Sequence, residues 1–178
     1  YGQLPLFDLG WFKLLFIENK GMAWGATIND FLPFISERTG KLFLTLFRVV
    51  AVTFIFYWLY DSIKKNAGKL LTISLSLILA GAIGNIIDSV FYGYLFTESY
   101  YNVAQFNPGN GYESLFHGHV VDMLQFPMVS WEWPKWLPYL GGESFTFFEP
   151  VFNIADTSIS TGVGIMLLFN KKIYSQNS

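Results

Sequence analysis

Residues 70–95, LLTISLSLILAGAIGNIIDSVFYGYL, form a long and mainly apolar segment that indicates the fold class of this chain. A helix needs about 20 mainly apolar residues to cross a bilayer, and this stretch exceeds that length. Two further stretches of this kind cover residues 42–60, which include Arg48, and residues 151–169. We therefore predict a mainly α, polytopic membrane protein built on a bundle of transmembrane helices.

The composition supports the same class. Of the 178 residues, 52% are hydrophobic, 20% are aromatic and only 13% are charged, against about 25% charged residues in soluble domains. The net charge of −2 comes without a basic cluster, which argues against a nucleic-acid partner. The absence of cysteine excludes disulfides and thiolate chemistry. We expect one membrane-embedded domain over residues 1–178, without a signal peptide, because no basic segment precedes an apolar run at Tyr1.

Lysines set the expected orientation, since short cytoplasmic loops are enriched in basic residues. They crowd the link between the first two spans and follow the third span: Lys64, Lys65, Lys69, Lys171 and Lys172. Residues 1–41 and 96–150 then lie on the outer side. Within them, residues 12–17 are expected to form a strand, 19–21 a turn and 107–111 a loop.

Polar residues converge on the outer ends of the spans. Asn85 and Asp88 are three residues apart near the end of the second span, as are Asn153 and Asp156 at the start of the third, and Asp122 lies on the segment between them. An isolated aspartate at a helix end is most simply a cap. A carboxylate within the bilayer costs about 2.5–3.5 kcal/mol, however, so several at one depth indicate function. Asp122 and Asp156 together suggest an aspartyl dyad that hydrolyses a bond at the membrane surface.

Other chemistries are less well supported. His117 and His119 resemble half of a zinc site, and His119 has helical i, i+3 spacing to Asp122, but no further ligand set is recognisable, so no metal or other cofactor is predicted. Serine catalysis lacks a Gly-x-Ser-x-Gly elbow. Arg48 is expected to snorkel outward or to pair with a buried carboxylate, preferably Asp88.

Two other function classes remain open. A proton-coupled transporter also uses intramembrane carboxylates, but it requires polar residues through the bilayer, whereas the inner part of the third span, such as residues 165–169, is apolar. A non-catalytic membrane subunit would tolerate asparagine at both aspartates. Trp131, Trp133 and Trp136, which lie beside prolines, are expected to anchor the outer segment at the interface.

Four blocks, in this order, resemble the motifs of lipoprotein signal peptidase, also called signal peptidase II, with an extended outer segment as in Bacteroidetes members. They are NKGMAWG (19–25), GAIGNIID (81–88), GHVVD (118–122) and FNIADTSI (152–159). The resemblance spans nearly the whole chain.

The resemblance implies four transmembrane helices, a small extracytoplasmic β-cradle and an interfacial helix. It implies an aspartic endopeptidase of the bacterial inner membrane, with its site facing the periplasm, that cuts prolipoproteins before the diacylglyceryl-modified cysteine and is blocked by globomycin-like peptides. It makes Asp122 and Asp156 catalytic and leaves open which of them is the base. Membrane lipid and a monomeric state are also expected. The residues implied to line or support the site are Asn19, Gly21, Asn85, Asp88, Asn153 and Ala155.

Three features depart from the family pattern. The Asp-Gln…Lys motif of the family's first helix is not found, so that helix is expected to be absent from this chain. Ser89 stands where an arginine often follows the residue matching Asp88. The outer segment, about residues 94–150, is much longer than usual.

Overall fold

The computed structural model describes residues 4–22, 25–99, 103–147 and 150–175. The chain forms two compact units. The helical unit comprises Asn19–Val120 and Ile154–Ser178, and the sheet unit comprises Tyr1–Glu18 and Val121–Asn153.

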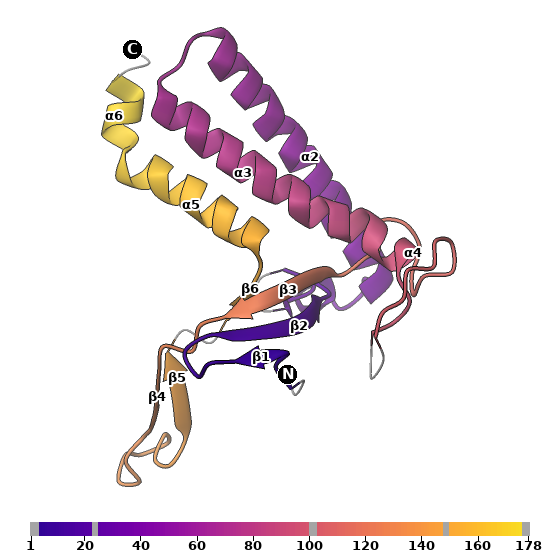
Figure 1. Ribbon diagram of the computed structural model, residues 1–178, viewed down its shortest axis with the longest axis vertical. Helices are drawn as coiled ribbons and strands as arrows, with labels where there is room; N and C mark the ends of the chain where they lie inside the picture. The colour runs from indigo at the N-terminus through magenta and orange to yellow at the C-terminus, as the bar shows by residue number, and fades with distance from the viewer. Residues whose placement is uncertain (1–3, 23–24, 100–102, 148–149, 176–178) are drawn as a thin grey trace. The chain divides into compact units, whose positions relative to one another are not determined.

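The helical unit is built on two long helices, α2 (Glu37–Lys64) and α3 (Lys69–Ile87), joined by the short lysine-bearing link (Figure 1). Ser36 caps α2, since its hydroxyl accepts a hydrogen bond from the Thr39 N–H at 3.2 Å. A π-helical turn, Asp88–Tyr92, and the short α4 (Gly93–Leu95) continue α3. Both α2 and the continuous stretch Lys69–Leu95 are long and apolar enough to cross a membrane. The mainly helical class is thus confirmed.

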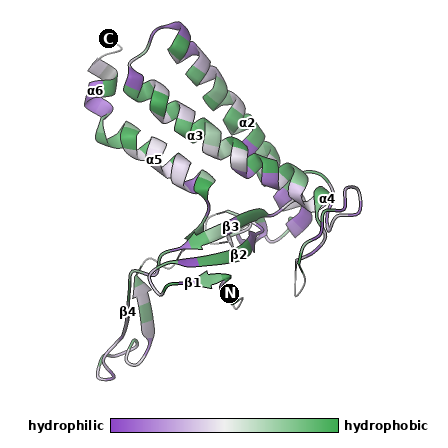
Figure 2. Ribbon diagram, in the orientation of Figure 1, coloured by the Kyte–Doolittle hydropathy of each residue, from purple (hydrophilic) through white to green (hydrophobic). Residues whose placement is uncertain are grey.

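α2 presents an apolar surface with little protein to cover it. Only 11% of its most apolar stretch is buried, and Phe43, Phe47 and Phe54 are 65%, 63% and 71% exposed. Figure 2 shows hydrophobic residues along α2, α3 and α5 (Ile154–Leu168). Within α2, the Thr53 hydroxyl bonds its own helix, since it donates to the Val49 carbonyl at 2.8 Å. Such a surface suits lipid rather than water.

Small residues allow α5 to pack closely on α3. A Cβ on Gly81 would collide with the Ala155 carbonyl, and one on Gly162 would lie 2.6 Å from the Ser74 carbonyl oxygen. Ser158 adds a hydrogen bond of 2.8 Å from its hydroxyl to the Leu77 carbonyl. This is the close small-residue packing expected of membrane helices.

The third apolar stretch is divided differently from the prediction of a span over residues 151–169. Val151–Phe152 forms strand β6, so α5 begins only at Ile154 and ends at Leu168. The short helix α6 (Asn170–Ser175) follows. Because the strand pairs with residues far away in sequence, the apolar pattern alone gave no sign of this boundary.

Substitution of Gly162 tests the packing of α3 against α5. Gly162→Ala should destabilise the protein by about 1–3 kcal/mol, because the new methyl group must displace the Ser74 backbone. Gly164→Ala is the matched control in the same helix, since its Cβ would meet nothing within 4 Å. Thermal unfolding in detergent measures both, and equal unfolding midpoints for the two variants would contradict this packing.

The sheet unit contains a four-stranded sheet in the order β1-β2-β3-β6. Its other members are β1 (Phe7–Asp8), β2 (Lys13–Asn19) and β3 (Val120–Gln125). β1 pairs antiparallel with β2, and β3 pairs antiparallel with β6 through Leu124 opposite Phe152. The predicted strand at residues 12–17 is confirmed, whereas a helical relation between His119 and Asp122 is wrong, since Asp122 lies in a strand.

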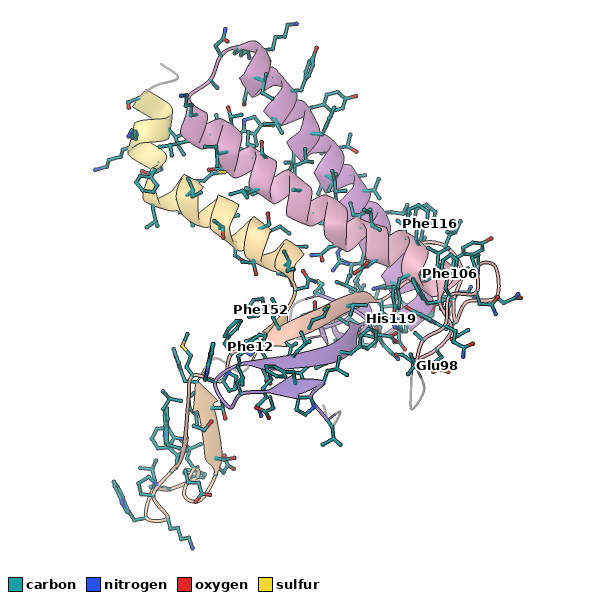
Figure 3. The ribbon with its side chains drawn as sticks, in the orientation of Figure 1. Phe12, Glu98, Phe106, Phe116, His119 and Phe152 are labelled. Carbon is teal, nitrogen blue, oxygen red and sulfur yellow. The ribbon has the colours of Figure 1, made fainter. Side chains whose placement is uncertain are left out.

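Aromatic rings cover this sheet. Phe126 lies between Phe12 and Phe152, with ring centroids 5.1 and 5.9 Å away, and Figure 3 labels the two outer rings. The expected tryptophan cluster lies apart, in a hairpin of β4 (Val129–Glu132) and β5 (Ser144–Phe147). There the Trp131 ring contacts those of Trp133 and Phe145 at 5.6 and 4.7 Å.

The short helix α1 (Ile28–Phe31) is held by its first turn. The Asp30 carboxylate accepts hydrogen bonds from the Thr27 N–H at 2.6 Å and from the Thr27 hydroxyl at 2.8 Å. These bonds, the backbone bond first, hold the pKa of Asp30 below its usual 3.8. The carboxylate is therefore expected to stabilise the fold above the pH at which it titrates in the unfolded chain, and that contribution disappears as the pH falls through its lower folded-state pKa.

Asp30→Asn tests this contribution. The variant should unfold at a lower temperature than wild type at neutral pH, and the difference should vanish in acid, once Asp30 of the wild type is protonated. Asp61→Asn removes an exposed carboxylate at the far end of α2 and serves as the control. A difference that persists at the acid end of the scan would contradict the proposed role of the charge.

Candidate active site

Asp122 is a buried carboxyl with a dedicated amide partner. It lies in β3 on the same side as Val120, and only 5% of its surface is exposed. Asn153, which directly follows β6 and is itself 9% exposed, donates from Nδ2 to Asp122 Oδ1 at 2.9 Å. The antiparallel pairing of β3 with β6 produces this contact, because Leu124 lies opposite Phe152 and the residue after Phe152 therefore comes beside the residues that precede Leu124. The hydrogen bond fixes the rotation of the carboxyl group.

Asp156 has an equivalent partner within the helical unit. It stands in the first turn of α5, where the helix dipole favours a carboxylate. Asn85 of α3 donates from Nδ2 to Asp156 Oδ1 at 2.9 Å. The two helices approach closely here because Gly84 faces Ala155, where an added Cβ would lie 3.3 Å from the alanine methyl group. Ala155 thus supports the position of the carboxyl that follows it.

Asn19 and Gly21 form a turn that Arg48 holds in place. Asn19 Oδ1 accepts the Gly21 N–H at 2.9 Å, which matches the predicted turn. Arg48 of α2 donates from Nη2 to the Gly21 carbonyl and from Nη1 to the Ser89 hydroxyl, each at 3.0 Å. Sequence reasoning missed both of these partners, because nothing in the local pattern relates residues 21, 48 and 89. The expected pairing of Arg48 with Asp88 stays a prediction.

Asp88 begins the π-helical turn at the end of α3, and the outer segment is fastened there. Gly118 donates its N–H to the Ser89 carbonyl at 2.9 Å. A Cβ on Gly118 would collide with the Asp88 carbonyl, so only glycine permits this approach. The block GHVVD therefore starts against α3, and its aspartate belongs to the sheet unit.

The two histidines have separate surroundings. His117 Nδ1 lies 2.9 Å from the Leu115 carbonyl and 3.1 Å from the Ser114 hydroxyl. The His119 ring lies tilted against the Tyr112 ring, with centroids 4.9 Å apart, and the His119 backbone N–H donates to the Tyr112 hydroxyl at 2.7 Å. Within the described residues, no three His, Asp or Glu side chains are grouped as metal ligands.

The predicted site residues thus form three local groups. Asp122 is bound to Asn153; Asp156 is bound to Asn85 and supported by Ala155; and the Asn19–Gly21 turn is held by Arg48, whose other contact is Ser89, next to Asp88. The two aspartates belong to different units, and each is oriented by an asparagine from its own unit.

Comparisons with known proteins agree with this arrangement. Residues 2–171 match the family model described as signal peptidase (SPase) II. Proteins named lipoprotein signal peptidase are 49% identical in Porphyromonas gingivalis, over 89% of this chain and 66% of that protein, and 36% identical in Amoebophilus asiaticus, over 94% of this chain and 64% of that protein. The chain thus spans about two thirds of the length of these relatives.

A solved structure described as a bacterial membrane enzyme has a similar fold. It superposes with a TM-score of 0.52 at 22% identity, covering 97% of this chain and 73% of the other. The likeness to the Porphyromonas protein also confirms the expected Bacteroidetes-like character. Given the family match over nearly its whole length, the chain belongs to the signal peptidase II family.

Proposed function

We propose that this protein is an intramembrane aspartic endopeptidase that removes the signal peptide from prolipoproteins. It would cut before the diacylglyceryl-modified cysteine, with Asp122 and Asp156 as the catalytic pair. The observation that carries the proposal is that each aspartate accepts a hydrogen bond from its own asparagine at 2.9 Å, and that Asp122 is almost fully buried.

Chain connectivity supports a meeting of the two carboxyls. Asn153, which binds Asp122, precedes Asp156 by only three residues. Two carboxyls at short distance share one proton, because both cannot ionise cheaply. The pair then titrates as a unit and offers one acid and one base at the same pH.

The reaction follows from these two states. The ionised carboxylate takes a proton from a water molecule, whose oxygen attacks the scissile carbonyl, while the protonated carboxyl donates to the carbonyl oxygen. The tetrahedral intermediate then collapses as the C–N bond breaks, and the cysteine nitrogen leaves with a proton. The products are a signal peptide with a new carboxyl terminus and a lipoprotein with a free cysteine amine. This route needs no metal or other cofactor.

Substrate class follows from membrane position. The acyl chains of a lipidated cysteine remain in the leaflet and hold the scissile bond near its surface. We propose that the chain is a multi-pass protein of the bacterial inner membrane with its site towards the periplasm. Its partners would be prolipoproteins, membrane lipid and globomycin-like inhibitors, and it would act as a monomer. Asn19, Gly21, Asn85, Asp88, Asn153 and Ala155 would line or support the site.

A gel-shift assay tests the proposal. The detergent-purified protein is incubated with a diacylglyceryl-modified prolipoprotein and a chelator, and with the same precursor lacking the lipid. Cleavage of the lipidated precursor alone, blocked by globomycin, is the expected result. Cleavage of neither, together with proton uptake by vesicles that contain the protein, would instead favour a transporter.

A further inference from the structure

The helical unit contains a cavity of about 510 Å³ whose lining includes neither Asp122 nor Asp156. Four segments wall it: Lys20 and Gly21, the region of Thr27 and Ile28, the start of α2 from Glu37 to Leu44, and the outer segment between Thr97 and His119. Its volume falls within the range of small-molecule sites, about 300–1,000 Å³. The long outer segment therefore has a structural consequence: it closes one side of a pocket.

Lys41 lines this cavity and is the exceptional residue in it. It lies one turn into α2 and is only 8% exposed. Its Nζ has no hydrogen-bond partner among the described residues. A buried ammonium group without a partner is costly, and natural proteins rarely keep one unless a ligand or counter-ion compensates it.

The other cations of the cavity are already neutralised. Lys20 Nζ lies 3.8 Å from Glu37, and Arg38 lies 3.4 Å from Glu113. The remaining carboxylate in the lining, Glu98, is exposed and accepts no hydrogen bond from Lys41 Nζ. Figure 3 labels Glu98 and His119 on the outer segment. Among the residues that the structure describes, the cavity thus holds one buried positive charge for which the chain supplies no partner.

The position of the cavity along α2 indicates which anion would reach it. The apolar part of α2 begins directly after Lys41, and Phe43 and Phe47 are 65% and 63% exposed. Because the apolar span of α2 begins there, Lys41 lies where the helix would enter the bilayer, at the level of the lipid headgroups. At that depth the abundant anion is the phosphate of phospholipids, whose oxygens accept strong hydrogen bonds from an ammonium group.

We propose that this cavity binds the phosphate of a membrane phospholipid headgroup and that Lys41 is the residue that recognises it. The phosphate oxygens would accept hydrogen bonds from Lys41 Nζ and neutralise its charge, while the acyl chains would remain against the exposed phenylalanines of α2. This site goes beyond the peptidase function and does not depend on Asp122 or Asp156.

Binding of soluble short-chain lipids tests the proposal. Protein in a phosphate-free maltoside detergent is titrated with dihexanoylphosphatidylglycerol, with dihexanoylglycerol, which lacks the phosphate, and with inorganic phosphate. The variants are Lys41→Met and, as the matched control, Lys64→Met, which removes an exposed lysine at the other end of the same helix. The phosphatidylglycerol should bind wild type and Lys64→Met alike and bind Lys41→Met about 10- to 100-fold more weakly, as expected for a lost charged hydrogen bond.

A second measurement separates ligand binding from a structural role. Without lipid, Lys41→Met should unfold at a higher temperature than wild type, because a buried unpaired charge has been removed. Equal lipid affinity of Lys41→Met and wild type would overturn the proposal, as would a lower unfolding temperature of the lipid-free variant. If inorganic phosphate bound as tightly as the lipid, the claim that the bound phosphate belongs to a lipid headgroup would be wrong. None of these readouts depends on peptidase activity.

Discussion

Asp122→Asn and Asp156→Asn should each lower the rate of prolipoprotein cleavage by about 10²- to 10⁴-fold, the range that a general acid or base contributes. Each substitution keeps the shape of the side chain and removes one titrating group. The carboxyl that remains cannot serve as general acid and general base at the same time. Single-turnover gel-shift kinetics with a diacylglyceryl-modified precursor measure the effect.

The control is Asp61→Asn, the same change at an exposed residue whose carboxylate lies 2.7 Å from Lys65 Nζ at the far end of α2. It should cleave at the wild-type rate. The two site variants should also unfold at temperatures near that of wild type, since their role is chemical. Wild-type turnover by either site variant would remove that aspartate from the mechanism.

Asn153→Leu and Asn85→Leu should each lower the rate by about 10- to 100-fold. Each substitution removes the amide that donates to one aspartate, and a hydrogen bond to a charged group contributes about 1.5–3 kcal/mol. Leucine has a similar volume, so packing changes little. A carboxylate that loses a donor holds its proton to higher pH.

The pH dependence of these two variants assigns the roles within the pair. The acid limb of the profile of kcat/KM should move to higher pH in the variant whose asparagine served the general base. In the other variant the basic limb should move instead, because the general acid then retains its proton longer. Profiles unchanged from wild type in both variants would show that the asparagines do not orient the reacting groups.

Local pattern allowed part of this fold to be predicted. The length of the apolar segments located α2 and α3, and the turn-forming residues Asn19–Gly21 marked the turn after β2. The local sequence pattern failed to predict structure where strands that are distant in sequence pair with each other. The apolar residues at 151–152 could belong equally to a helix or a strand, and only the pairing of β6 with β3 decides between them.

In the candidate site, too, local features could be predicted from the sequence and contacts between distant residues could not. The i, i+3 spacing predicted Asn153 and Asp156 at the same depth, and it did not predict that Asn153 donates to Asp122 and Asn85 to Asp156. The contacts of Arg48 with Gly21 and Ser89 join residues 27 and 41 positions away. Spacing rules describe neighbours on one helix, and they contain no information about which helix or strand lies opposite.

The β4–β5 hairpin has a consequence for how this chain can change in evolution and engineering. Gln125, the last residue of β3, lies opposite Val151, the first residue of β6, so the chain leaves the sheet and returns to it at the same place. The sequence and length of the hairpin therefore have little effect on the sheet. Doubling the length of a loop raises the free-energy cost of closing it by only about 0.6 kcal/mol. The hairpin tip is the natural insertion point for a reporter peptide or an affinity tag, and lineages are free to lengthen or shorten it without re-registering the strand that carries Asp122.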